Sequence, residues 1–287
     1  MSHLISFLIK FSIFIKNIHN SIQFPPEFQC YPHIESELSC QIRNLQLPRD
    51  EEFLCNEIEN VVNITQLTVL ESKIPVLNLS ICNFLPSLKR FDAQGLRIHK
   101  IQENTFEKCT ELEVVDLTDN KINVLPKNLF QNNLALMSIK LDSNRLKKLD
   151  DEIFINLPEL QFLSIADNNL TEFSPFLLKR NQKLSFIYIF LNNLSDLDLE
   201  KLHEVNPNLR SINMNLNEIS CSRISEMIVF AEENWIALSR HSFGTRTRFY
   251  EVKEYERFFC LDDVTWAANH YRKQIEENYL NKYLIVY

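Results

Sequence analysis

The chain has 287 residues, of which 45% are hydrophobic and 24% are charged, so it can bury a core and is not intrinsically disordered. It contains only two glycines, Gly95 and Gly244, which excludes the glycine-rich loops of Rossmann dehydrogenases, P-loop NTPases and protein kinases, and the nucleophile elbow of serine hydrolases. A formal net charge of −8 argues against nucleic acid or an anionic membrane as the main partner.

The N-terminal region contains an apolar run that we interpret as the core of a signal peptide. Residues 4–15 read LISFLIKFSIFI and are interrupted only by Lys10 and two serines. The run is shorter than the roughly 20 apolar residues that span a bilayer. It therefore predicts a signal peptide over residues 1–23, with a buried N-terminal helix as the alternative. No other window is long enough to cross a membrane, so we expect no membrane span.

Seven cysteines lie mainly toward the two ends of the chain, at positions 30, 40, 55, 82, 109, 221 and 260. The chain has no CxxC or HExxH motif, so we expect neither a metal site nor a cofactor. The distribution predicts disulfide-bonded terminal caps. The expected pairs are Cys30 with Cys40, Cys221 with Cys260, and Cys55 with Cys82. Cys109 is then the odd thiol, which we expect to be a small buried hydrophobic residue.

Four N-x-[ST] sequons predict N-glycosylation, at Asn63, Asn78, Asn169 and Asn193. Glycans of this kind and disulfides both belong to proteins that pass through the secretory pathway. Together with the apolar N-terminal run, they favour a secreted, extracellular protein.

A 24-residue repeat organises the middle of the chain. Its copies begin at Ile64, Leu88, Leu112, Leu136, Leu160, Leu184 and, after 25 residues, Leu209. Each copy follows the pattern L-x-x-L-x-L-x-x-N-x-L, with Ser72 and Leu96 in place of the asparagine in the first two. Self-similarity at a fixed period of this length is the signature of a solenoid, in which successive copies stack as coils.

Each position of the repeat has a physical role. Positions 4 and 6 alternate with polar residues, which predicts a short strand with one apolar face. The asparagine at position 9 is expected to bond backbone groups of its own coil and of the neighbouring coil. It occurs as Asn120, Asn144, Asn168, Asn192 and Asn217. Position 19 holds Phe106, Phe130 and Phe154 and predicts a stacked spine on the outer side of the coils.

This pattern resembles the extracellular, 24-residue type of the leucine-rich repeat family over about residues 64–220. The resemblance implies an α/β solenoid, a horseshoe with a parallel β-sheet on its concave face and a cap at each end. It also implies a recognition function, because members of the family mostly bind proteins, glycans or lipids. The expected organisation is a signal peptide (1–23), an N-terminal cap (24–63), seven repeats (64–220) and a C-terminal cap (221–287).

The two caps are expected to cover the open ends of the solenoid core. Cys30 and Cys40 are placed to close a hairpin whose second arm pairs with the edge of the repeat sheet. After the last repeat, apolar residues at helical spacing predict an amphipathic helix. These residues are Ile224, Met227, Ile228, Ala231 and Trp235. A strand over residues 246–252 and a second helix over residues 262–278 are expected to follow.

This C-terminal arrangement is similar to the caps of secreted insect leucine-rich repeat proteins, such as the leucine-rich immune molecules of mosquitoes. Those proteins typically continue into a coiled coil. Here about ten residues follow the second expected helix, too few for three heptads. We therefore expect a monomer or a weak homo-oligomer.

The concave face carries the candidate ligand site, because positions 3, 5 and 7 point outward there. Most of this face is polar, but it includes one apolar patch, formed by Phe162, Phe186, Tyr188, Phe190 and Leu191. Adjacent exposed aromatics predict a binding site, whereas the alternative is stacking across strands without a partner. A second, charged stripe is interpreted as a solvated face; it comprises Asp92, Asp116, Asp119 and Lys140.

The sequence therefore predicts a non-catalytic, secreted protein that binds a protein, or a glycan or lipid, on the concave face. Innate immunity and cell-surface adhesion are the expected settings. The alternative is an intracellular scaffold or regulatory subunit, which the long repeat period and the cysteine-bearing caps disfavour. A third interpretation is an enzyme with its site in the C-terminal region, which contains His241, Cys260, Asp262, Asp263 and His270. Their spacing matches no catalytic constellation.

Overall fold

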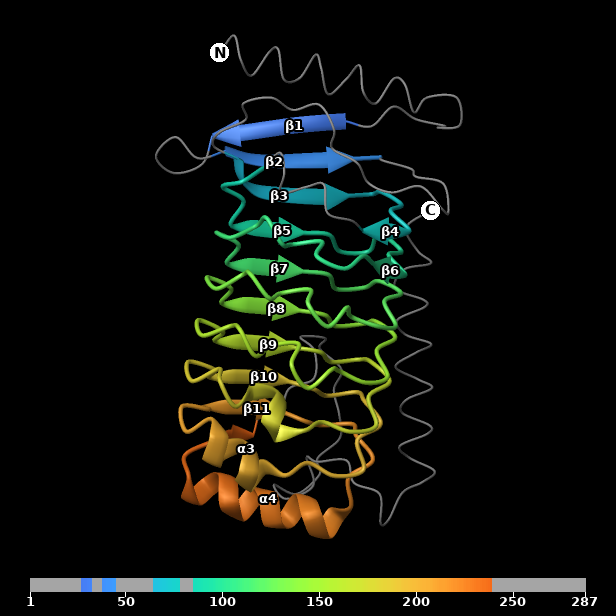
Figure 1. The fold of residues 1–287 in the computed structure, drawn as a ribbon. Helices are drawn as coiled ribbons and strands as arrows, with labels where there is room; N and C mark the ends of the chain where they lie inside the picture. Colours follow the sequence, from blue (N-terminus) through green and yellow to red (C-terminus); the bar gives the residue numbers. More distant parts are fainter. Residues whose placement is uncertain (1–26, 33–37, 45–63, 78–84, 239–287) are drawn as a thin grey trace.

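A computed structural model describes residues 27–32, 38–44, 64–77 and 85–238 of the chain (Figure 1). Several sequence predictions lie outside these ranges and stay predictions. They are the signal peptide, the sequons at Asn63 and Asn78, the roles of Cys55, Cys82 and Cys260, and the strand and helix expected over 246–252 and 262–278.

The described residues form a solenoid whose coils stack one above the next, with a ten-stranded sheet along one side (Figure 1). The strands are, in sheet order, β1 (Glu27–Pro32), β2 (Leu38–Arg43), β3 (Ile64–Leu70), β5 (Arg90–Asp92), β7 (Val114–Asp116), β8 (Ser138–Lys140), β9 (Phe162–Ser164), β10 (Phe186–Tyr188), β11 (Ser211–Asn213) and β12 (Ala237–Leu238). A second sheet pairs β4 (Val76–Leu77) with β6 (Lys100–Ile101). The other elements are the 3-10 helix η2 (Pro175–Leu178), α3 (Leu199–Val205) and α4 (Cys221–Glu233).

The strand register confirms the repeat. All pairs of the long sheet are parallel except β1–β2. Val115 lies opposite Ile139 and Ile139 opposite Leu163, so residues 24 apart face each other. At the 25-residue step, Ile187 lies opposite Ile212. Equal positions of successive repeats therefore form columns, and each column has one chemical character along the solenoid.

The predicted asparagine column is confirmed. In a typical case, Asn144 Oδ1 accepts a hydrogen bond from the Ile122 N–H at 3.0 Å. Its Nδ2 donates to the Leu117 carbonyl of the preceding coil at 2.9 Å and to the Leu141 carbonyl of its own coil at 3.1 Å. One side chain thus bonds backbone groups of two coils, and the column as a whole provides the partners that these buried groups need.

The phenylalanine spine is also confirmed. The Phe106 and Phe130 ring centroids lie 5.9 Å apart with nearly parallel rings, and those of Phe130 and Phe154 lie 6.5 Å apart. All three side chains are buried. They fill the convex half of the coils, where a continuous aromatic stack replaces regular secondary structure as the packing element.

Cys109 corrects the sequence analysis, because it is disulfide-bonded rather than an odd thiol. Cys40 and Cys221 are disulfide-bonded as well, and the side chains of the partners lie outside the described residues, so the expected pairs stay predictions. Cys109 belongs to a buried column at position 22 that the sequence analysis missed. In that column, the Asn133 amide donates to the Cys109 carbonyl at 2.8 Å, and the Asn181 amide donates to the Leu157 carbonyl at 2.8 Å.

The N-terminal hairpin is confirmed at the level of the backbone. β1 and β2 are antiparallel with Cys30 opposite Cys40, and β2 pairs in parallel with the edge strand β3. The first coil of the repeat array is therefore covered by an added strand, which satisfies its backbone edge.

The predicted cap helix α4 lies at the other end of the solenoid and buries Ile224, Met227 and Ala231 (Figure 1). The prediction was wrong for Trp235. The helix ends at Glu233, and Trp235 follows with a φ of 57° and a side chain that is 92% exposed. The left-handed residue closes the helix end by letting the Ile236 N–H donate to the Ala231 carbonyl at 2.9 Å.

Arg223 joins α4 to the preceding coil. Its guanidinium donates to Glu200 at 2.6 Å, to Asp196 at 3.0 Å and to the Leu197 carbonyl at 3.0 Å. The Glu200 carboxylate beside it raises the pKa of Arg223, and the same bond lowers the pKa of Glu200. A planar guanidinium that bonds several acceptors at once fixes the cap helix more firmly than a lysine would.

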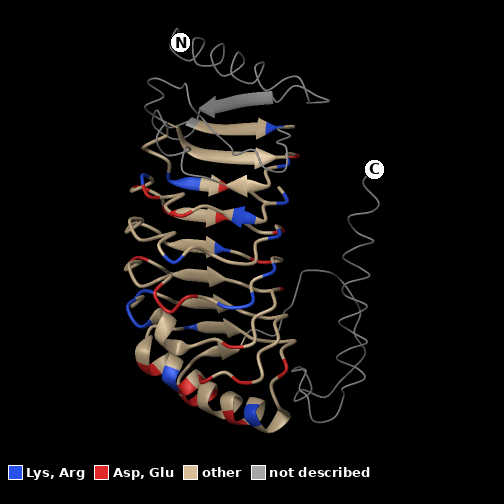
Figure 2. Ribbon diagram, turned by 45° about the vertical axis from the view of Figure 1, so that its right-hand side comes forward, with Lys and Arg blue, Asp and Glu red and all other residues tan. Residues whose placement is uncertain are grey.

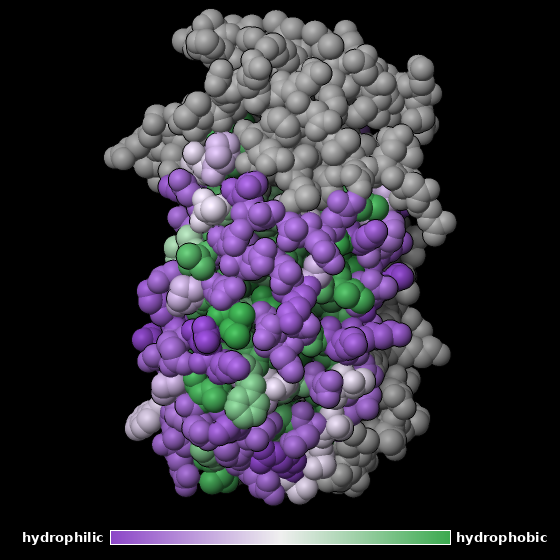
Figure 3. Space-filling view, viewed as in Figure 1, coloured by the Kyte–Doolittle hydropathy of each residue, from purple (hydrophilic) through white to green (hydrophobic). Residues whose placement is uncertain are grey.

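The charged residues of the described chain lie mainly on the loops and on α3 and α4 (Figure 2). The face shown in Figure 3 is mostly hydrophilic, and its apolar residues form small separate patches. Within the described ranges, no helix is both long enough and apolar enough to cross a membrane.

Candidate functional site

The β10 strand presents its aromatics as the sequence predicted. Ile187 is fully buried on the core side, whereas Phe186 is 40% exposed and Tyr188 is half-buried on the outer side. Phe186 lies opposite Phe162 in the β9–β10 register. The Phe162 and Tyr188 rings meet edge to face, with centroids 5.2 Å apart. The structure therefore brings Phe162, Phe186 and Tyr188 together on two neighbouring strands.

Phe190 and Leu191 are not exposed members of this patch, which corrects the sequence analysis. Phe190 is 8% exposed and Leu191 is 6% exposed, and both form a buried cluster with Ala166. Tyr188 and Leu216 pack against the same cluster. The candidate site thus has a partly exposed aromatic surface, Phe162 with Phe186 and Tyr188, beside a buried apolar support.

The backbone explains the burial of Leu191. Position 8 of every repeat adopts a positive φ, which turns the chain away from the sheet. The residues are Glu71, Gly95, Asp119, Ser143, Asp167, Leu191 and Leu216. Leu191 has a φ of 54° and Leu216 a φ of 57°. A leucine in this conformation is strained by about 1 to 2 kcal/mol, and the packing of the support compensates for that strain.

The charged stripe is only partly the solvated face that the sequence predicted. Asp116 is 5% exposed, and its Oδ2 lies 3.1 Å from the Lys140 ammonium. Asp92 is half-buried, so burial raises the pKa of its carboxyl, and the Asp116 charge raises it further. Asp119 likewise has a raised pKa, from burial and from the Asp167 charge. Asp116 and Lys140 therefore form a paired structural group and not a free binding surface.

Asp142 is a site residue that the sequence analysis did not single out. Its Oδ1 accepts hydrogen bonds from the Ser164 hydroxyl and, at 2.8 Å, from the Ala166 N–H. Burial raises the pKa of the carboxyl from 3.8 to about 6 despite these two bonds. Ala166 also belongs to the buried support, so Asp142 connects the charged stripe to the aromatic half of the concave face. Its place at position 7, directly after the buried Leu141 and next to Ala166 at position 7 of the following repeat, is the signal that the sequence offered.

We expect Asp142→Asn to stabilise the protein increasingly as pH rises. The folded state holds the Asp142 proton up to about pH 6, whereas the unfolded state releases it near 3.8. The contribution of this group to the free energy of unfolding is therefore present at low pH and is lost as pH rises through about 6. A shift of two units corresponds to about 3 kcal/mol at most, and for a half-buried group we expect about 1 to 2 kcal/mol.

The measurement is urea unfolding of both proteins at pH 4 and pH 7.5. Asparagine keeps an oxygen for Ser164 and Ala166, so the two hydrogen bonds survive the change. The exposed Asp151 of the same repeat, changed to asparagine, is the control for the loss of one carboxylate, and its stability difference is expected to stay below about 0.5 kcal/mol at both pH values. An equal stability difference at both pH values would contradict the prediction.

Within the described ranges, no group of three or more His, Cys, Asp or Glu residues is arranged to hold a metal ion. The concave face instead offers a rigid row of aromatic side chains beside a network of paired and buried charges. Such a surface can bind a partner by burying apolar area, with the neighbouring polar groups setting the orientation.

Comparison with known proteins agrees with this fold. Residues 134–194 match the family model described as leucine rich repeat. No curated protein matches the chain significantly in sequence. Two structural relatives are the APL1 leucine-rich repeat domain and a chain of the LRIM1/APL1C complex, both mosquito immune proteins.

The APL1 domain superposes with a TM-score of 0.55 at 22% identity, over 63% of this chain and 47% of that chain. For the LRIM1/APL1C complex the TM-score is 0.54 at 22% identity, over 68% of this chain and 36% of that chain. The match thus spans less than half the length of either relative. The described part of this protein is therefore a leucine-rich repeat solenoid similar in fold to these mosquito immune proteins.

Proposed function

We propose that this protein is a non-catalytic, secreted recognition protein that binds a protein partner through Phe162, Phe186 and Tyr188. The observation that carries the proposal is the aromatic row on β9 and β10, in which Phe186 is exposed and Phe162 and Tyr188 are half-buried. Leucine-rich repeat domains are in general protein-binding scaffolds. A role in innate immunity or in cell-surface adhesion follows from the resemblance of the repeats and caps to those of secreted insect proteins.

The aromatic row has the properties of a binding hot spot. Aromatic side chains bury a large apolar area and lose little conformational entropy when they bind. Here the strands hold them in place, because the backbones of β9 and β10 are paired and Ile187 is anchored in the core. Tyr188 also packs against the buried cluster that contains the strained Leu191, which favours a preorganised surface over a loosely packed one.

The double variant Phe186→Ala with Tyr188→Ala is expected to abolish capture of the partner while lowering the melting temperature only slightly. Both side chains lie on the outer side of β10, so their loss removes contact area without opening the core. The test is chemical cross-linking of the purified full-length protein to proteins of the extracellular fluid of its source, followed by mass spectrometry. Phe176→Ala is the matched control, because Phe176 is also an exposed phenylalanine, 52% exposed, but lies on η2.

A partner captured by the wild type and by Phe176→Ala but not by the double variant supports the proposal. Equal capture by all three proteins would show that the aromatic row is not the binding surface. A cross-linked homodimer that only the double variant loses would identify self-association as the role of the row.

The proposed secretion has a separate test. The full-length chain is expressed in insect cells, and its intact mass is measured in the medium and in the lysate without reduction. Secretion predicts protein in the medium that has lost its first twenty or so residues, carries glycans and contains disulfides. Unprocessed protein with free thiols, found only in the lysate, would support the intracellular scaffold instead.

A further inference from the structure

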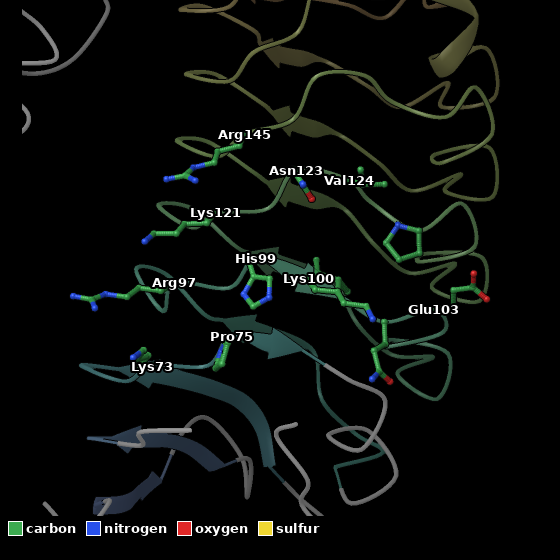
Figure 4. A pocket seen from close by; sticks show the side chains of 13 residues that line it. Lys73, Pro75, Arg97, His99, Lys100, Glu103, Lys121, Asn123, Val124 and Arg145 are labelled. Atoms are coloured by element: carbon green, nitrogen blue, oxygen red, sulfur yellow. The ribbon is translucent and has the colours of Figure 1, made fainter. Parts of the chain in front are cut away.

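A groove on the side of the solenoid lies away from the aromatic row and has a distinct chemical character. It has a volume of about 1200 Å³ and runs across four successive coils, from Lys73 to Arg145. It is formed by the segments that follow the strands, between the left-handed turn at position 8 and the first part of the convex side (Figure 4). The groove therefore runs along the solenoid axis and crosses the coils.

Position 10 of the repeat supplies one cation per coil along one edge of the groove. These residues are Lys73, Arg97, Lys121 and Arg145, and all four are exposed. Figure 4 shows their side chains one above the other, with His99 between them and the rest of the groove. Lys100 adds a fifth charged group, and Glu103, at the opposite edge, is the single carboxylate among the described lining residues.

The backbone beneath these cations is held by hydrogen bonds between coils. The Lys121 N–H donates to the Ile98 carbonyl at 2.7 Å, and the Arg145 N–H donates to the Ile122 carbonyl at 2.8 Å. Neighbouring parallel strands are about 4.8 Å apart, so the coils present cations at about that interval. The column ends after four coils, because Asn169 occupies position 10 of the next one.

Stability of the fold does not account for this column. Like charges on neighbouring coils repel each other, as like charges do across strands of a sheet. None of the five Lys and Arg residues of the groove makes an ion pair with another residue in the described part of the chain. The groove concentrates positive charge in a protein whose net charge is −8. Such local concentration of one sign attracts a ligand of the opposite sign.

We propose that this groove is a second binding site, which takes a linear sulfated polysaccharide. Sulfate groups accept charge-assisted hydrogen bonds from arginine and lysine. A highly sulfated chain carries several sulfates per disaccharide, so it can offer an anion to each coil that it crosses. The other lining groups suit a sugar: Asn123 and Gln102 provide amides for hydroxyl groups, and the exposed Val124 provides aliphatic contact surface.

Two other polyanions fit the groove less well. Single-stranded nucleic acid is bound through aromatic side chains that stack on the bases, and the described lining residues include no Phe, Tyr or Trp. An extended acidic peptide presents side chains on one face about every 6.6 Å, out of phase with cations about 4.8 Å apart.

The test is binding of a fully sulfated heparin dodecasaccharide to the full-length protein, measured by isothermal titration calorimetry at about 0.15 M salt. The variant Arg97→Gln with Lys121→Gln is expected to lower the affinity about 10- to 100-fold, because it removes two charge-assisted contacts from the centre of the column. The control variant, Lys179→Gln with Arg180→Gln, removes the same two residue types from an exposed site outside the groove. Both variants change the net charge equally, and thermal unfolding checks that both are folded.

Loss of affinity in the groove variant alone supports the site. Equal loss in both variants would show a general charge effect, and absence of binding by the wild type would overturn the proposal. Tighter binding of an oligonucleotide or of polyglutamate than of the dodecasaccharide would overturn the identity of the ligand. The aromatic variant of β10 should bind the dodecasaccharide as the wild type does, so this result is independent of the proposed protein-binding site.

Discussion

Replacing Phe130 with alanine is expected to lower the free energy of unfolding by about 3 to 5 kcal/mol. Phe130 is the middle ring of the convex spine, 5.9 Å from Phe106 and 6.5 Å from Phe154 between ring centroids, and it is 1% exposed. Removing the ring leaves a cavity that neither neighbour can fill, because each is held by its own coil. The loss then includes both the transfer of apolar area to water and the cost of the cavity.

Urea unfolding followed by circular dichroism measures this change. Leu134→Ala is the matched control, since Leu134 lies in the same coil but is 57% exposed, and we expect a loss below about 0.5 kcal/mol. A broader transition for Phe130→Ala would show that the two halves of the solenoid unfold separately, because coils are stabilised mainly by their neighbours. A loss below 1 kcal/mol would mean that the spine is not an energetic element of the fold.

The second large effect is expected for Asn168→Ala, at about 2 to 4 kcal/mol. The Asn168 oxygen accepts from the Leu146 N–H at 2.9 Å, and its Nδ2 donates to the Leu141 carbonyl at 3.0 Å. The same Nδ2 also donates to carbonyls of its own coil. Alanine leaves the buried Leu146 N–H without its partner and removes one donor from each of these carbonyls, which keep a second donor. An unpaired buried group costs about 1 to 3 kcal/mol, and the lost bonds to the carbonyls add to that cost.

The control is Asn123→Ala, measured in the same unfolding experiment. Asn123 is exposed, so we expect its loss to leave the free energy of unfolding nearly unchanged. The comparison shows whether the effect at Asn168 comes from its buried position or from the loss of any asparagine. Asn168→Asp adds a second comparison. Aspartate keeps an acceptor for Leu146 but cannot donate, and it would bury a charge, so a loss at least as large as that of alanine is expected at pH 7. Near-wild-type stability of either Asn168 variant would refute the structural role of the column.

At the candidate site, the sequence predicted the aromatic patch only in part. The period-2 pattern of β10 correctly placed Phe186 and Tyr188 outward and Ile187 inward. The same extrapolation failed for Phe190 and Leu191, because the strand ends at Tyr188 and the chain turns at Leu191 with a positive φ. Alternation applies only while the backbone is extended, and the end of a three-residue strand is set by its turn.

The net charge of the chain was also an incomplete guide to its possible ligands. The net charge of −8 argued against nucleic acid or an anionic membrane as the main partner. The sequence analysis did not single out Lys73, Arg97, Lys121 and Arg145, although they share position 10 of the repeat. Their shared position predicts that these side chains stack, but only the structure shows the groove that they border. The raised pKa of Asp142 likewise depends on the tertiary structure, because stacking of the coils buries its carboxyl.

The sequence by itself determined the solenoid, its register, the asparagine column and the phenylalanine spine. Each of these depends on one position that recurs every 24 residues, so the repeat alone brings equal positions together. The tertiary structure alone decided the bonded state of Cys109, the burial of Phe190 and Leu191, the exposure of Trp235 and the groove that the position 10 cations border. These depend on where a strand or helix ends and on which different side chains meet across coils. The ends of the elements and the contacts between unlike side chains are both results of packing in three dimensions. A pattern of residues along the chain does not specify that packing.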